Sequence, residues 1–471
     1  MRLGALIGSG GDSMVTGFAI DHRKVAPGTV FGAFRGARFD GEDFIPDAIG
    51  SGAVAVVARP EARVEGAVHI AAEEPRRDFA WLAAKFFAPF PKTVIAVTGT
   101  NGKTSSVELC RQLWRMAGHP SASIGTLGVT TADDQVTTGL TTPDIVTFLS
   151  NMAGLAKMGI SHAAFEASSH GLSQYRTEGL PVQAAAFTNF TRDHLDYHET
   201  MDAYFEAKMR LFSEVVDPSG AAVIWTDDPK SGEVERLCRE RGLSVLTVGT
   251  RGQALRLVSR ETTELGQKLA IEADGKRHVV TLALIGAYQA ANALTAAGLV
   301  IATGGEVAQT LSNLSRVHPV RGRLERAVIT RAGAPIYVDY AHTADAIESA
   351  IEALRPHTAG RLIIVFGAGG DRDQGKRAEM GAAAVRLSDL VIVTDDNPRS
   401  EDPAAIRRDI LAGAPGALEV PGRRAAIEAA VAEARDGDII LLAGKGHEQG
   451  QIVGDRILPF DDVTVARECA G

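Results

Sequence analysis

Two glycines, a lysine and a threonine lie in the segment Val-Ile-Ala-Val-Thr-Gly-Thr-Asn-Gly-Lys-Thr at positions 94–104, with a spacing that suits phosphate binding. Gly99 and Gly102 let the backbone bend so that its N–H groups and the following helix start face phosphate oxygens. In such a loop Lys103 holds the outer phosphates and the Thr104 hydroxyl binds Mg²⁺. The first glycine stands three residues before the second instead of five, but a strand precedes the loop and a helix follows it. We therefore predict a nucleotide site, rather than a chance Gly-Lys-Thr, formed by Gly99, Thr100, Asn101, Gly102, Lys103, Thr104 and Ser105.

Polar clusters follow two further predicted strands, at 162–165 and 184–188. The first strand leads into Glu166-Ala-Ser-Ser-His-Gly and the second into Asn189-Phe-Thr-Arg-Asp-His. Ligands of open α/β sheets bind beyond the carboxyl ends of the strands. We therefore expect Glu166 to bind Mg²⁺ directly or through water, and His194 to be a ligand of a second metal ion. Taken singly, the alternatives are a solvated loop carboxylate for Glu166 and a helix-capping or core histidine for His194.

A third set of strand ends lies near the C-terminus, in segments that begin at Asp339, Gly367, Asp395 and Gly444. These segments contain two arginines, Arg372 and Arg399, and one carboxylate, Glu448. Arginine suits a carboxylate ligand, and a lone carboxylate suits an ammonium group. A zwitterionic amino acid with an extra carboxylate matches this set. The alternative is that Arg399 pairs with Asp396 at a helix start, with Asn397-Pro398 forming a turn.

The elements that position these residues fall into three segments. A chain of 471 residues exceeds what one core usually holds, so about three domains are expected. Prolines interrupt regular structure in Ala88-Pro-Phe-Pro-Lys and in His318-Pro-Val-Arg-Gly. We therefore predict domains at 1–89, 90–318 and 319–471.

Alternation of strands and helices predicts an α/β fold with parallel sheets. We expect a small N-terminal α/β domain, a central phosphate-loop ATPase-type domain with a mainly parallel sheet, and a C-terminal Rossmann-like α/β domain. In the first domain we predict strands at 30–34 and 54–57 and a helix at 75–87; in the second, a further strand at 93–97. In the third we predict strands at 335–339, 361–366, 390–394 and 438–442 and helices at 345–354 and 424–434.

The composition of the chain limits the kinds of binding partner that we expect. The formal net charge of −9 argues against a nucleic-acid-binding surface, although a few arginines in a pocket can still bind a small anion. The three cysteines have no metal-type spacing, which suits a reducing compartment. We see no targeting segment and no stretch long enough to cross a bilayer. We therefore expect a cytoplasmic protein that acts on small molecules, without nucleic-acid or membrane partners.

Several motifs together resemble the Mur ligase superfamily over essentially the whole chain. They are the phosphate loop at 98–104, Glu166-Ala-Ser-Ser-His, Gln289-Ala-Ala-Asn, Gly322-Arg-Leu-Glu and Asp339-Tyr-Ala-His. Asp396-Asn-Pro-Arg resembles the motif by which one branch of the family selects diaminopimelate; lysine-adding relatives are expected to lack the arginine. The resemblance implies a monomeric, ATP- and Mg²⁺-dependent ligase of peptidoglycan precursor synthesis, which adds meso-diaminopimelate to a UDP-muramoyl dipeptide.

The resemblance also implies roles for individual residues. Lys103, Glu166, His194 and Lys208 would be catalytic, with Thr104, Glu166, His194 and a carbamylated Lys208 around the metal. Asn292, Arg323 and Asp339 would hold the adenine, phosphate and ribose of ATP. Thr141, Thr142, Ser168, Gln174 and Arg176 would contact the UDP-muramoyl dipeptide, and Arg372, Asp396, Asn397, Pro398, Arg399, Gly444 and Glu448 would bind diaminopimelate. Two positions depart from the family pattern: His22 stands where a serine touches the uridine nucleotide, and Gln289 where asparagine is common. By its residue type alone, Lys208 would be a surface lysine on a helix.

The implied mechanism has two steps. The D-glutamate γ-carboxylate takes the γ-phosphoryl group of ATP, and an amine of diaminopimelate then displaces phosphate from the acyl phosphate. Because water would destroy that intermediate, we expect the third domain to close over the site, with 318–322 as the candidate hinge. The alternatives are a lysine-adding ligase, a folylpolyglutamate synthetase-like ligase, a phosphate-loop kinase and a nucleotide-sensing binding protein.

Overall fold

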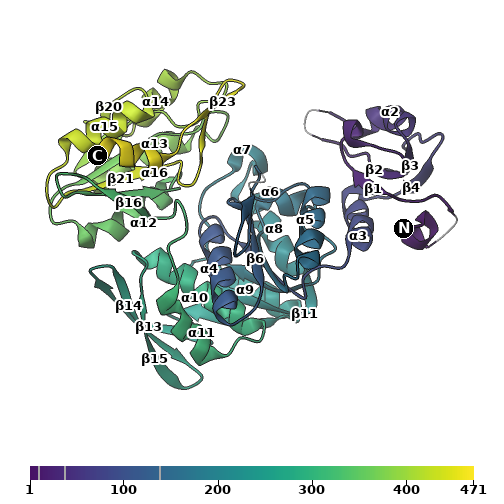
Figure 1. The fold of residues 1–471 in the computed structure, drawn as a ribbon, viewed down its shortest axis with the longest axis horizontal. Helices are drawn as coiled ribbons and strands as arrows, with labels where there is room; N and C mark the ends of the chain where they lie inside the picture. Colours follow the sequence, from purple (N-terminus) through teal and green to yellow (C-terminus); the bar gives the residue numbers. More distant parts are fainter. Residues whose placement is uncertain (9–10, 37–38, 137–138) are drawn as a thin grey trace.

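Three main sheets follow one another along the chain in the computed structural model, which describes residues 1–8, 11–36, 39–136 and 139–471 (Figure 1). The first is a parallel sheet in the order β1 (Gly17–Ala19), β2 (Thr29–Gly32), β3 (Ala53–Ala58) and β4 (Val68–Ala71). Helix α3 (Pro75–Phe87) leads from this sheet to the next one and packs against α5 (Ile145–Lys157). The predicted N-terminal strands and helix are confirmed, and we keep 1–89, 90–318 and 319–471 as proposed domain limits.

Six parallel strands form the middle of the central sheet, with β5 (Thr93–Thr98) among them. Their order is β12 (Ser244–Gly249), β11 (Val216–Trp225), β10 (Val182–Phe187), β5, β9 (His162–Glu166) and β6 (Ser121–Gly125). Alternate side chains of β5 enter opposite layers: Val94 packs with α5, and Ile95 packs with α4 (Lys103–Met116) and α10 (Ala287–Ala302). Both layers are covered, which explains why β5 is apolar throughout.

Further strands extend both edges of the central sheet. One edge carries the antiparallel strands β7 (Gly128–Thr130) and β8 (Gln135–Val136). The other carries β13 (Leu255–Thr263), which is parallel to its neighbour, and then the antiparallel strands β14 (Gly266–Ala273) and β15 (Lys276–Leu282). Asp274 and Gly275 form the two-residue turn between β14 and β15, both with positive φ. The strands β13–β15 project away from the other parts in Figure 1.

The third sheet has the order β16 (Glu325–Ile329), β17 (Pro335–Asp339), β21 (Ile439–Ala443), β18 (Leu362–Phe366), β19 (Leu390–Val393) and β20 (Leu418–Glu419). All pairs are parallel except β16–β17. Helices α12 (Ala344–Leu354), α13 (Lys376–Leu387) and α14 (Pro403–Leu411) cover one face, and α15 (Arg423–Glu433) and α16 (Asp462–Ala470) the other. The predicted Rossmann-like alternation is confirmed; antiparallel β16 and the hairpin β22 (Gly450–Val453)–β23 (Arg456–Pro459) were not predicted.

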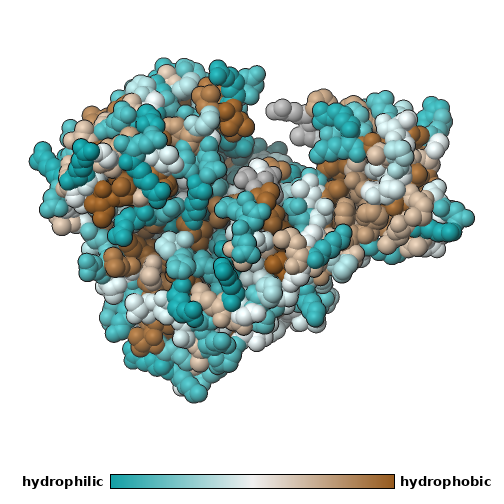
Figure 2. Space-filling model, viewed as in Figure 1, coloured by the Kyte–Doolittle hydropathy of each residue, from teal (hydrophilic) through white to brown (hydrophobic). Residues whose placement is uncertain are grey.

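The shorter elements complete the chain, and several contribute to the site below. They are α1 (Leu3–Ile7), α2 (Ile45–Gly50), α6 (Ser169–Ser173), α7 (Leu195–His198), α8 (Met201–Arg210), α9 (Ser231–Glu240) and α11 (Val307–Asn313). An open notch separates the N-terminal part from the C-terminal part on the largely hydrophilic face drawn in Figure 2. Among the described residues, no helix is both long and apolar enough to span a membrane.

Candidate active site

The phosphate loop joins β5 to α4 as predicted, and neighbouring elements leave no room for side chains at its two glycines. A Cβ on Gly102, whose φ is +85°, would lie 2.3 Å from Asn292 Oδ1. On Gly99 it would collide with the Thr188 hydroxyl at the end of β10. The same strand end holds the loop, because Asn101 N donates to Asn189 Oδ1 at 2.8 Å. Only glycine therefore gives the loop this path.

Two lysines lie beneath this loop, Lys103 half-buried and Lys208 buried. Lys103 donates to the carbonyl oxygens of Gly99 (2.9 Å) and Thr100 (2.7 Å), and burial lowers its pKa. Lys208, from α8, is 1% exposed, donates to Gly99 O at 2.7 Å and lies 4.4 Å from the ring centre of Tyr204. The surface position expected from its residue type is wrong. Burial, reinforced by the charge of Lys103, lowers the pKa of Lys208 well below its usual value, which favours the neutral amine.

Glu166 ends β9 and is 1% exposed, so the solvated-loop alternative is wrong. Its carboxylate accepts from the backbone N (2.7 Å) and the hydroxyl (3.1 Å) of Thr126. Its carbonyl oxygen accepts from Thr142 Oγ1 at 2.9 Å, and that hydroxyl lies 2.9 Å from Ser168 Oγ. Thr141 Oγ1 in turn lies 3.1 Å from Thr126 Oγ1. Glu166 is thus hydrogen-bonded into the row of hydroxyl groups predicted to contact substrate.

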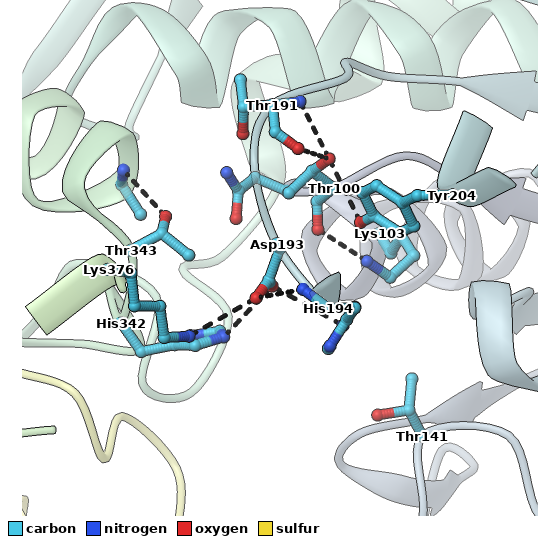
Figure 3. Close-up of polar contacts among 12 residues, drawn as sticks. Thr100, Lys103, Thr141, Thr191, Asp193, His194, Tyr204, His342, Thr343 and Lys376 are labelled. Carbon is cyan, nitrogen blue, oxygen red and sulfur yellow. Dashed lines mark hydrogen bonds and ion pairs between the residues drawn. The ribbon is translucent and has the colours of Figure 1, made fainter. Parts of the chain in front are cut away.

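His194 follows β10 and precedes α7 with a left-handed φ of 56°. Its side chain makes no capping hydrogen bond and is 35% exposed, so the alternatives of a helix-capping and of a core histidine are both wrong. Partial burial lowers the pKa of His194 to about 3. The imidazole is therefore neutral near pH 7 and keeps a lone pair. The preceding Asp193 is 4% exposed and meets Lys376 and His342 from the C-terminal part (Figure 3). Although burial would raise the pKa of Asp193, the hydrogen bond with His342 and the charge of Lys376 hold it well below its usual range.

A first cavity of about 360 Å³ lies between the central and C-terminal parts, next to the phosphate loop. Arg323 crosses from the C-terminal part and donates to Thr104 Oγ1 at 2.7 Å. Asp339 Oδ2 accepts from Leu324 N at 2.7 Å, and burial raises the pKa of Asp339. Of the predicted nucleotide residues, this cavity is lined by Asn101, Gly102, Ser105, Asn292, Arg323 and Asp339; Trp225, Asp227 and Tyr288 also line it and were not predicted.

A second cavity of about 410 Å³ gathers most of the predicted substrate residues from the same two parts of the chain. Its lining includes Thr141, Thr142, Ser168, Arg176, His194, Arg372, Asp396, Asn397, Arg399, Gly444 and Glu448. Gln174 supports it by accepting from Arg176 at 2.6 Å, and Pro398, which is buried, is not among its lining residues. His22 is not brought to either cavity: it lies in the N-terminal part and stacks on Phe44 with ring centres 4.4 Å apart.

The C-terminal wall of the second cavity holds its arginines and its carboxylates with different partners. Arg399 donates to Gly370 O at 2.8 Å, which ties it to the loop of Arg372. Asp396 faces Lys445 Nζ at 3.7 Å, so the predicted alternative of an Arg399–Asp396 pair is wrong. The fully buried Lys445 also lies 3.1 Å from Glu448 Oε2. Sequence reasoning missed Lys445, Asp193, His342 and Lys376, although all four lie in or next to the polar strand ends that it singled out.

A phosphate-loop α/β domain, closed by a second α/β domain that completes both cavities, defines the architecture of an ATP-dependent ligase. Family models match three successive stretches: "Mur ligase family, catalytic domain" at 14–85, "Mur ligase middle domain" at 97–300 and "Mur ligase, glutamate ligase domain" at 322–446. The chain belongs to the Mur ligase family.

Relatives cover nearly its whole length. It is 59% identical over 461 residues to the UDP-N-acetylmuramoyl-L-alanyl-D-glutamate--2,6-diaminopimelate ligase of Zymomonas mobilis, covering 97% of this chain and 95% of the relative. The enzyme of the same name from Caulobacter vibrioides is 50% identical over 96% of this chain and 94% of its own. A solved structure with that name superposes with a TM-score of 0.72 at 30% identity, covering 100% of this chain and 98% of the other. The MurF ligase of Thermotoga maritima in complex with ADP shares the fold, with a TM-score of 0.64 at 20% identity over 97% of each chain.

Proposed function

We propose that this chain is an ATP-dependent ligase that joins meso-diaminopimelate to the D-glutamate γ-carboxylate of UDP-N-acetylmuramoyl-L-alanyl-D-glutamate in peptidoglycan precursor synthesis. The names of relatives at 59% and 50% identity support this assignment. The observation that carries it is the second cavity, in which Arg372, Arg399 and Glu448 of one domain face Thr142 and Arg176 of another. Such a cavity can hold an amino acid with an extra carboxylate against an anionic acyl donor.

The first step transfers the γ-phosphoryl group of ATP to the substrate carboxylate and releases ADP. ATP would occupy the first cavity, with its phosphates along the loop and Lys103, because backbone N–H groups and a helix start favour anions. Asn292, Asp339 and Arg323 would bind adenine, ribose and phosphate respectively. In the second step a neutral amine attacks the acyl carbon and inorganic phosphate leaves. Closure between the two domains protects the acyl phosphate from water.

We also propose that Mg²⁺ binds near Thr104, Glu166 and His194, and that Lys208 is carbamylated. Glu166 and neutral His194 supply suitable donor atoms, and a buried lysine with a lowered pKa can react with carbon dioxide. Among the described residues, no three His, Cys, Asp or Glu side chains lie together as a metal site. This fits Mg²⁺ held largely by water and substrate phosphates. When bound, Mg²⁺ would neutralise charge on the transferring phosphoryl group.

In the remaining assignments, Thr141, Thr142, Ser168, Gln174 and Arg176 would contact the muramoyl dipeptide, and His22 the uridine nucleotide. Asp396, Asn397, Pro398 and Gly444 would complete the amino-acid site. We expect the chain to act as a monomer, because both cavities are completed within one chain. We also expect it to act in the cytoplasm.

The test is phosphate release from ATP by the purified protein with the UDP-muramoyl dipeptide, with meso-diaminopimelate or L-lysine supplied in parallel. We expect release that requires the dipeptide and diaminopimelate and is much slower with lysine. Equal rates with lysine would contradict the amino-acid assignment. Release that does not depend on the dipeptide would contradict the ligase assignment and favour a kinase or a simple ATPase.

A further inference from the structure

Asp193 lies where the central and C-terminal domains meet, between groups that belong to different strand ends. Its Oδ1 lies 3.4 Å from Lys376 Nζ, and its Oδ2 lies 3.7 Å from His342 Nε2 (Figure 3). The Asp193 side chain is 6% exposed and the Lys376 side chain 10%. The backbone N of His194 also donates to Oδ1 at 2.9 Å, which fixes the carboxylate at the end of β10.

Neighbouring interdomain ion pairs differ in their exposure. Arg192 Nη1 lies 3.0 Å from Glu379 Oε1, with these side chains 43% and 50% exposed. An exposed pair of this kind contributes little, because water screens it. Removal of one partner from the buried Asp193–Lys376 pair instead leaves an unpaired charge away from solvent. Removing the Asp193 carboxylate should therefore weaken the contact between the two domains more than removing a partner of the exposed pair.

Lys376 connects this contact to the amino-acid side of the second cavity. It is the first residue of α13 and follows directly the loop 369–375, which contains Arg372. Arg377 anchors the other end of that loop by donating to Gly369 O at 3.3 Å. The ion pair between Lys376 and Asp193 thus holds the loop 369–375 against the segment that carries His194.

We propose that Asp193, through Lys376, is a positioning residue for the second step: it holds the Arg372 loop against the central domain while the amine attacks the acyl phosphate. This inference rests on the proposed ligase function. The first step uses the phosphate loop and the dipeptide carboxylate, so it should proceed without the contact. The second step needs the amine aligned with the acyl carbon, and a displacement of about 1 Å can cost about 100-fold in rate.

Hydroxylamine separates the two steps, because it intercepts an acyl phosphate as a hydroxamate without using the amino-acid site. For Asp193→Asn and Lys376→Met we expect hydroxamate formation within about threefold of the unaltered protein. Amide formation with diaminopimelate should fall by about 100-fold, with a raised KM for diaminopimelate. The double variant should be no slower than Asp193→Asn alone, because both changes break one contact. Lys376→Arg should restore most of the amide rate.

Glu379→Gln is the matched control on the same helix, and its amide rate should change by less than about twofold. An equal fall of hydroxamate and amide in Asp193→Asn would overturn the inference, because Asp193 would then act in phosphoryl transfer or in folding. Unchanged amide formation in both single variants would overturn it as well. Failure of the unaltered protein to form either product would instead count against the proposed function.

Discussion

Replacing Arg399 with alanine removes one of the three guanidinium groups, those of Arg176, Arg372 and Arg399, that line the second cavity. The backbone around it is held independently of the side chain: Arg399 N donates to Ile452 O at 3.0 Å, and Gly454 N donates to Arg399 O at 2.7 Å. The φ of Arg399 is 53°, a conformation that costs alanine about as much as arginine. The change should therefore remain local and act mainly on ligand binding.

The magnitude follows from the contact that is lost. Truncating one partner of a desolvated, hydrogen-bonded charge pair costs about 2 to 5 kcal/mol. Arg399 is half-buried, and one of its N–H groups already donates to Gly370 O at 2.8 Å. The lower part of that range therefore applies, about 2 to 3 kcal/mol. This corresponds to an increase of about 30- to 160-fold in the KM for diaminopimelate.

The assay is phosphate release at saturating ATP and dipeptide while diaminopimelate or lysine is varied. The KM for lysine should change little, because lysine has no second carboxylate for Arg399 to bind. ATP affinity should also persist, because Arg399 does not line the first cavity. Arg408→Ala is the control, an exposed arginine of α14 outside both cavities. An unchanged KM for diaminopimelate in Arg399→Ala would refute the assignment of this wall to the extra carboxylate.

Three further outcomes follow from buried charges. If Lys208 is carbamylated, carbon-13-labelled bicarbonate should give a carbamate resonance that is lost in Lys208→Met together with phosphate release; no such signal in the active protein would contradict the modification. Asp462→Ala should destabilise the C-terminal domain by about 3 to 5 kcal/mol in urea unfolding, because Arg423 is then buried without its partner, whereas the exposed Arg424→Ala should cost less than about 1 kcal/mol. Burial, and then the charge of His119, lowers the pKa of His162 from 6.5 to about 4, so the folded state binds fewer protons than the unfolded chain. Stability should fall as pH drops from about 6.5 to about 4, and less steeply in His162→Gln.

In the central sheet, the parallel strands β5, β9 and β10 were predicted because each has an apolar interior and is followed by polar residues, whereas β6, β11 and β12 were not predicted. The phosphate loop is the clearest case, since a strand, two glycines and a helix stand in one continuous stretch. The hairpin β14–β15 was missed although Asp274-Gly275 between alternating strands is a strong local signal. The burial of Lys208 could not be predicted from the sequence of α8 alone, because it depends on the phosphate loop, 109 residues earlier in the chain.

The contact between the domains at Asp193 could not be predicted from the sequence for a similar reason. Asp193 and Lys376 are separated by 183 residues, and either one alone reads as a surface charge. Only the approach of the segment after β10 to the start of α13 makes them a buried pair. Sequence reasoning therefore identified which strand ends matter, but not which of their charges meet.

The end of β17 explains why closure of the C-terminal domain can serve both substrates at once. Asp339 lines the first cavity, His342 lines the second, and Tyr340 lines both. These residues span one short turn, so they move as a unit with the sheet that carries them. Arg323, stacked 4.6 Å from the Tyr340 ring, reaches Thr104 of the phosphate loop from the same side. If the C-terminal domain closes as proposed, the movement that brings Asp339 to the nucleotide would also bring His342 to Asp193 and would couple the two cavities mechanically.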